Sequence, residues 1–190
     1  VDPADGQNIW LDKNGNKTKT YSDDDKVMTG KTMYAPWSGG LSTSVSWKGL
    51  QLDVQFTGMF GRYMMNNERF FTENGTFASS DNQSVTMLDI WTTPGQITNI
   101  PAADADIQFD THLLENADFI RLKMLQLSYT LPKSLMNSTG FIKDCKVYFI
   151  GRNLLTWTDF KGYDPEVNSN LTLGNYPNTR QFSAGIQLTF

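Results

Sequence analysis

Two acidic residues, Asp164 and Glu166, have the types and spacing that come nearest to catalytic chemistry. On an extended segment, residues i and i+2 share a face, and two carboxylates about 5–10 Å apart can hydrolyse a glycosidic bond. However, Pro165 lies between them, and the sequence holds no second motif of such an enzyme. We therefore interpret the pair as part of a loop turn, and we predict no catalytic residue in this chain.

Three further patterns could bind a metal ion. The run Asp23-Asp24-Asp25 lacks the glycine and the distal glutamate of a calcium loop, and is interpreted as a solvated loop. His112 is the only histidine and Cys145 the only cysteine, so neither has a partner of its own type for zinc binding, a proton relay or an internal disulfide. We predict no metal site and no cofactor.

Composition excludes some classes of protein and leaves the membrane question open. The chain has 190 residues and a net charge of −4, which is too small and of the wrong sign for nucleic-acid binding. No apolar run is long enough for a transmembrane helix or a signal peptide. The mean hydropathy of −0.41 is typical of a soluble protein, but the strands of membrane barrels are also half polar. Because the first residue is Val1, we expect a mature chain or a fragment.

Alternation of apolar and polar residues predicts an all-β fold. The clearest case is the end of the chain, where Phe182, Ile186 and Phe190 alternate with small polar residues. Lys48-Gly49 predicts a tight turn between two strands. The predicted strands are 41–48, 50–60, 119–131, 145–157 and 181–190.

The strand at 119–131 changes phase part-way. Leu125 and Leu127 share one face, whereas Ile120 and Leu122 follow the other phase. Either a β-bulge near Met124 resets the register, or the basic residues of this strand lie on the outer face near a headgroup rim, where charges cost only about 0–1 kcal/mol. We favour the bulge.

The lengths of the connections alternate between short and long along the chain. A tight turn is followed by a long connection at 61–117, a short one at 132–144 and a long one at 158–179. Outer-membrane barrels have short periplasmic turns and longer extracellular loops. The order predicts antiparallel up-and-down strands of a transmembrane β-barrel with 61–117 and 158–179 outside. Aromatic residues are then expected near the inner rim at Trp47, Tyr129 and Phe190, and near the outer rim at Phe119, Trp157 and Phe182.

The long connections carry the candidate binding residues. A loop as long as 61–117 is either a binding loop or an excursion packed on its own aromatic residues. Phe70, Phe71, Trp91 and Tyr163 are candidates to stack on sugar rings or to pack against a partner protein.

Several stretches together resemble the C-terminal end of SusC/RagA-type TonB-dependent outer-membrane transporters. They are YAPWSGG at 34–40 running on to Trp47-Lys48-Gly49, NADFIRLKMLQLSYTLP at 116–132, GRNLLTW at 151–157, GYDPEV at 162–167 and RQFSAGIQLTF at 180–190.

The resemblance implies a nutrient importer in the bacterial outer membrane, surrounded by lipid, with about 22 strands around a plugged lumen. Since this chain supplies about five strands, we expect it to be the C-terminal part of a longer protein. The implied partners are a SusD-like surface lipoprotein that captures oligosaccharide or peptide substrates, and the TonB complex, reached through an N-terminal part outside this chain. Phe190 resembles the terminal signal that the barrel-assembly machinery recognises.

A soluble, secreted, β-rich glycan-binding module is the alternative. Aromatic residues in predicted loops, such as Trp37, Trp91 and Tyr163, motivate it. Such a module is expected to have two sheets whose apolar faces pack on each other.

Overall fold

The computed structural model describes residues 1–137, 140–169, 171–172 and 174–190. The chain forms two compact units, which we describe separately. The loop unit comprises Val1–Met33, Tyr63–Glu115 and Asn168–Asn175, and the sheet unit comprises Tyr34–Arg62, Asn116–Val167 and Tyr176–Phe190.

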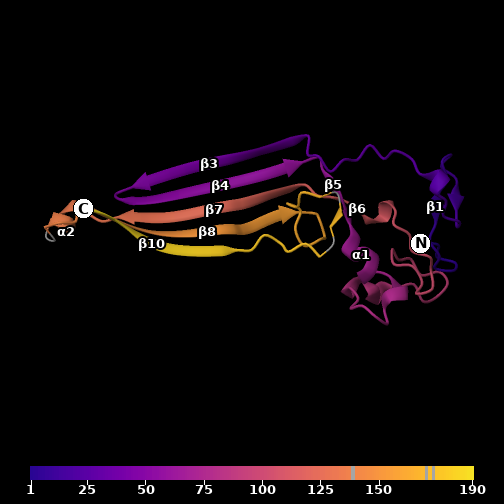
Figure 1. The fold of residues 1–190 in the computed structure, drawn as a ribbon. Helices are drawn as coiled ribbons and strands as arrows, with labels where there is room; N and C mark the ends of the chain where they lie inside the picture. Colours follow the sequence, from indigo (N-terminus) through magenta and orange to yellow (C-terminus); the bar gives the residue numbers. More distant parts are fainter. Residues whose placement is uncertain (138–139, 170, 173) are drawn as a thin grey trace. The chain divides into compact units, whose positions relative to one another are not determined.

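The sheet unit is built on a five-stranded sheet of order β10-β8-β7-β4-β3, in which every neighbouring pair is antiparallel. The strands lie side by side in Figure 1. Each strand pairs with the strands of this sheet that precede and follow it along the chain, which confirms the predicted up-and-down arrangement. The strands are β3 (Trp37–Trp47), β4 (Leu50–Phe60), β7 (Phe119–Thr130), β8 (Asp144–Thr158) and β10 (Gln181–Thr189).

A two-residue turn joins β3 to β4. Lys48 and Gly49 have φ values of 47° and 87°, and positive φ at both central residues is the type I′ pattern that matches the twist of a hairpin. A Cβ atom at Gly49 would lie 2.7 Å from the carbonyl oxygen of Thr130. Position 49 therefore requires glycine on two grounds, its backbone conformation and its contact with β7.

The phase change in β7 is a β-bulge, as favoured from the sequence. The pairing of β7 with β8 shifts between Leu122 and Met124, leaving Lys123 out of the ladder. Ile120 consequently aligns with Trp157 on the apolar face. The expectation that Phe119 lies at the outer rim was wrong, because the same shift turns its side chain to the opposite face, where it is 2% exposed.

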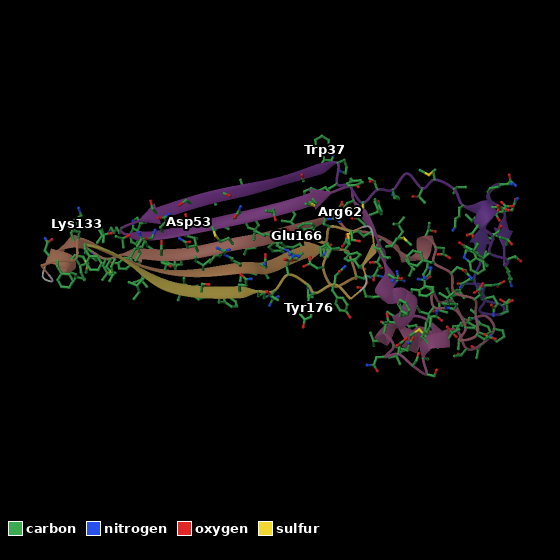
Figure 2. All side chains as sticks on the ribbon, in the orientation of Figure 1. Trp37, Asp53, Arg62, Lys133, Glu166 and Tyr176 are labelled. Atoms are coloured by element: carbon green, nitrogen blue, oxygen red, sulfur yellow. The ribbon has the colours of Figure 1, made fainter. Side chains whose placement is uncertain are left out.

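The two faces of this sheet differ in polarity, and the apolar one is open to its surroundings. The opposite face carries serine, threonine, glutamine and charged side chains, including Asp53 of β4, which Figure 2 labels toward the Lys133 end of the sheet. Large side chains on the apolar face are 37–68% exposed. They are Leu41, Val45, Trp47, Leu50, Leu52, Ile120, Leu127, Tyr129, Val147, Phe149, Leu155, Trp157, Phe182, Ile186 and Leu188.

The loop unit shows that 61–117 is folded rather than irregular throughout. It contains a three-stranded sheet of order β6-β5-β9 with a parallel β5–β9 pair, and a separate β1–β2 hairpin around Asn14-Gly15. Met64 and Leu113 are fully buried in its core. Its elements are β1 (Trp10–Leu11), β2 (Lys17–Thr18), β5 (Tyr63–Asn66), α1 (Asn67–Thr72), β6 (Leu114–Asn116), β9 (Leu171–Thr172) and 3₁₀ turns at Asp23–Asp25, Gly75–Phe77, Val85–Asp89 and Thr111–Leu113.

Helices are short throughout the described ranges. The sheet unit adds α2 (Lys133–Asn137) between β7 and β8, at the same end of the sheet as the chain's C-terminal residue (Figure 1). In the part of the chain that the structure describes, no helix has the length and apolar character needed to cross a membrane.

Candidate functional site on the polar face of the sheet

Arg121 is the centre of a buried ion-pair network on the polar face of β7. The bulge at Lys123 places Arg121 on this face, and its side chain is 3% exposed. Its Nε donates to the Thr156 hydroxyl (2.9 Å), Nη1 to a Glu166 carboxylate oxygen (2.7 Å) and Nη2 to Asp164 Oδ1 (2.5 Å). All three guanidinium nitrogens therefore have partners.

The two carboxylates of the GYDPEV motif complete this network. Glu166 also accepts two hydrogen bonds from Lys123 Nζ, at 2.7 and 2.8 Å. Asp164 Oδ1 accepts from the backbone N–H of Glu166 (2.8 Å), and its Oδ2 from the N–H of Asn178 (2.7 Å). We call Arg121, Lys123, Asp164 and Glu166 the ion-pair network; its two positive and two negative charges balance.

Electrostatics keeps Asp164 ionised. Burial on its own raises the pKa of this carboxyl, but the hydrogen bonds from Arg121 and from the N–H groups of Asn178 and Glu166 outweigh it, so the pKa lies below its ordinary value. A group that is ionised and fully hydrogen-bonded is a poor proton donor. The arrangement anchors 162–167 and Asn178 to β7, and neither carboxylate is free for acid–base chemistry.

A second buried arginine, Arg62, forms hydrogen bonds at the same end of the sheet. Arg62 is 4% exposed. Its backbone N–H donates to Asp118 Oδ1 (3.0 Å), and Nη2 of its side chain donates to the carbonyl oxygen of Val167 (2.9 Å). Figure 2 shows Arg62 and Glu166 at the end of the sheet away from Lys133. Arginine side chains of the sheet unit thus bind the 162–167 segment at Asp164, Glu166 and Val167.

A cavity of about 290 Å³ opens beside the network. Its wall includes Asn153 of β8, Tyr163, and Arg180, which directly precedes β10. Tyr163, a residue singled out from the sequence, is 68% exposed at this cavity.

The other predicted aromatic residues lie in the loop unit and pack on their neighbours. The rings of Phe70 and Phe71 meet edge to face at 5.3 Å, and Phe77 and Phe109 pack within 6.2 Å of them. Trp91 donates from Nε1 to the carbonyl oxygen of Pro3 (3.1 Å). These contacts support the expectation of a segment packed on its own aromatic residues, and a role in ligand binding stays a prediction.

Phe190 lies at the C-terminal end of β10, beside the connection from β7 to β8. Its ring stacks on Phe141 at 6.2 Å with an interplanar angle of 4°. Lys143 Nζ donates to the carbonyl oxygen of Phe190 (2.8 Å) and the backbone N–H of Lys143 to that of Thr189 (2.7 Å). The role of Phe190 in barrel assembly stays a prediction.

The residues considered for metal binding have partners of other kinds. Asp23 forms an ion pair with Lys26 (2.7 Å), and His112 Nδ1 lies 2.7 Å from Asp110 Oδ1. In the described ranges, no three His, Cys, Asp or Glu side chains are grouped so that they could bind a metal ion.

Arg121, Lys123, Asn153 and Arg180 are among the residues of this site that were not identified from the sequence. A signal did exist for the first two, because basic residues in a strand that is otherwise apolar call for a partner. For Asn153 and Arg180 the sequence offers no comparable signal.

Comparison with known proteins identifies the group to which the chain belongs. No family model matches it. A chain of the RagAB peptide importer in its open-open state superposes with a TM-score of 0.93 at 42% identity, covering 100% of this chain and 21% of that one. The chain belongs to the SusC/RagA-type TonB-dependent receptors. The closed-closed state of RagAB gives a TM-score of 0.90 at 44% identity, covering 100% of this chain and 22% of that one.

Curated relatives of this SusC/RagA-type chain are receptors of the same kind. TonB-dependent receptor P3 of Formosa agariphila is 28% identical over 97% of this chain and 19% of its own length. SusC of Bacteroides thetaiotaomicron is 21% identical over 97% of this chain and 18% of its own length. The chain thus spans about a fifth of these relatives.

Proposed function

We propose that this chain is the C-terminal part of the barrel of an outer-membrane importer that takes up oligosaccharides or peptides. In this proposal 61–117 and 158–179 are extracellular, and the polar face of the sheet lines a hydrated lumen. The relatives are named as receptors and as a peptide importer, which supports import and does not distinguish the two substrate classes.

The exposed apolar face is the observation that carries this proposal. It extends over all five strands of the sheet unit, with side chains such as Leu127 and Phe149 more than 40% exposed. Exposed apolar patches of this extent mark sites of contact with protein or membrane. Outer-membrane strands alternate between lipid-facing apolar residues and lumen-facing polar ones, and β4, β7, β8 and β10 show this alternation.

Further parts of the proposal concern partners. A SusD-like lipoprotein would deliver substrate, a TonB complex would supply energy through a part of the protein outside this chain, and the barrel-assembly machinery would recognise the strand that ends at Phe190. The RagAB match supports a partnered importer. The net charge of −4 gives no support to nucleic-acid binding.

We also propose that the protein is not an enzyme. Asp164 and Glu166, the carboxylates nearest to a hydrolytic pair, are both bound to basic side chains. Incubation of the full-length protein with labelled oligosaccharides should release no shortened product; release of product would contradict this.

A soluble, secreted glycan-binding module is the second candidate, since the exposed rings of Trp37 and Tyr163 suit stacking on sugars. Such a module needs a second sheet against the apolar face. Within the described residues of the sheet unit, the only sheet is the five-stranded one. This difference favours the membrane proposal.

Membrane fractionation of the full-length protein tests the proposal. We expect it in the outer-membrane fraction, migrating faster on gels before heating than after. Recovery as a soluble monomer with heat-insensitive migration would instead favour the glycan-binding module.

A further inference from the structure

The cavity beside the ion-pair network forms where β8 leaves regular strand geometry. Asn153 has φ of 53°, a left-handed conformation that asparagine tolerates better than most residues. The Leu154 side chain covers the backbone at Gly151, where a Cβ atom would lie 2.9 Å from it. Asn153 Nδ2 donates to the carbonyl oxygen of Thr179 (3.1 Å). The hydrogen bond ties β8 to the segment that leads into β10, and Asn153 and Leu154 both line the cavity.

Asn153, one of the residues that line the cavity, has a buried acceptor atom. Its Oδ1 is shielded from solvent and has no hydrogen-bond partner among the described residues. Because Nδ2 is bound to Thr179, the amide orientation is fixed and Oδ1 cannot exchange places with it. A buried acceptor without a donor is costly, so this atom favours a ligand that brings an O–H or N–H group.

Arg180 adds a positive charge to the same wall. No ion pair of Arg180 is found in the part of the chain that the structure describes, whereas Arg121, in the same cavity, is paired with Asp164 and Glu166. The guanidinium group of arginine matches a carboxylate with two parallel hydrogen bonds. The exposed ring of Tyr163 adds an aromatic surface to the wall beside Arg180 and Asn153, and the paired side chains of Arg121 and Asp164 line the same cavity.

We propose that this cavity binds a carboxylate that carries a neighbouring hydroxyl or N–H donor. The carboxylate pairs with Arg180, the donor satisfies Asn153 Oδ1, and the body of the ligand lies against Tyr163. The volume of about 290 Å³ is at the lower end for small-molecule sites, so the cavity takes one unit of a polymer. A uronic acid residue of a glycan and the C-terminal residue of a peptide both have this chemistry. The inference deepens the proposed import function and rests on it for biological meaning.

Titration calorimetry on the full-length protein in detergent micelles tests the site directly. The probes are glucuronate and N-acetyl-dialanine, each with an uncharged counterpart, methyl glucoside and N-acetyl-dialanine amide. At least one carboxylate should bind about tenfold or more tightly than its counterpart. Preference for glucuronate would indicate a glycan ligand, and preference for N-acetyl-dialanine a peptide ligand.

Variants locate the binding within this cavity. Arg180→Gln should weaken the preferred carboxylate about tenfold or more and leave its uncharged counterpart unchanged. Asn153→Gly, which keeps the left-handed backbone accessible, should weaken both. Arg152→Gln is the matched control, because Arg152 is an exposed arginine of β8, next to Asn153, and is outside the cavity lining. This variant should bind both probes as the parent protein does.

Three outcomes would overturn the site: no binding of either carboxylate, equal binding of charged and uncharged probes, or equal losses in Arg180→Gln and Arg152→Gln. Binding in micelles does not depend on membrane location or transport. A protein that fractionates as an outer-membrane barrel but binds neither carboxylate would keep the proposed function and lose this inference.

Discussion

Arg121 and Asp164 form an ion pair of 2.5 Å in which both side chains are 3% exposed, although 43 residues separate them in the sequence. Exposed ion pairs contribute little to stability, whereas a buried pair becomes strongly unfavourable once one partner is removed. The GYDPEV motif is therefore held to β7 by charges that depend on one another.

Removal of the guanidinium should release this segment. Arg121→Gln leaves the Asp164 carboxylate buried without its cation, which costs about 3–5 kcal/mol. Amide exchange in peptides covering 160–167 and 176–180 of the full-length protein should rise accordingly. Arg152→Gln, the exposed control, should leave exchange unchanged, and equal rates in the two variants would show that the network does not anchor the segment.

Lowering the pH should release the 162–167 segment only where Asp164 becomes protonated. The pKa of Asp164 is lowered in the folded state, so its contribution is complete above the unfolded value of about 3.9 and is lost as pH falls through the lower folded value. The rate of amide exchange in the peptides covering 160–167 and 176–180, corrected for its intrinsic pH dependence, should stay constant from pH 7 to 5 and increase below about pH 4. Asp164→Asn should remove much of this increase, and a loss centred near pH 6 would point to a different group.

The β3–β4 turn should tolerate no side chain at its second position. Gly49→Ala introduces a Cβ atom 2.7 Å from the Thr130 carbonyl oxygen at φ of 87°, and such backbone strain costs about 1–3 kcal/mol. The temperature at which the folded form is lost on gels should fall. Gly39→Ala, whose Cβ would meet nothing within 4 Å, should not lower it, and equal effects would argue against the steric explanation.

Phe190→Ala and Phe141→Ala separate an assembly signal from simple packing. Both substitutions remove the stack between the two rings, but only the first removes the terminal aromatic residue. If the assembly machinery recognises Phe190, the amount of heat-modifiable protein in the outer membrane should fall more for Phe190→Ala. Equal losses would assign the effect to the stack.

The sheet could be predicted from the sequence because alternation is a local signal. Each long strand shows the period of two, and the break of phase in β7 indicates the bulge at Lys123. The placement of Phe119 failed because the alternation on the C-terminal side of the bulge was extended through it. The partners of Arg121 could not be predicted, because pairing across 43 residues leaves no local pattern.

The fold of the loop unit was missed for a different reason. Its turns are held by single side chains, as where Asn74 accepts from the N–H of Thr76 and Asp110 from that of His112, and such caps give no periodic signal. Among the described residues, its parallel β5–β9 ladder pairs Met65 with Leu171 and Asn66 with Thr172. A ladder of that length is too short for hydrophobic periodicity to predict.

The environment of the apolar face is the most direct test of the central claim. Nitroxide labels placed at 127 and 126 of the full-length protein in lipid vesicles report collisions with oxygen, which concentrates in lipid, and with a water-soluble nickel chelate. We predict that the label at Leu127 collides mainly with oxygen and the label at Gln126, on the opposite face, mainly with the chelate. A label at 127 that is shielded from both reagents, or that favours the chelate, would contradict a lipid-facing sheet.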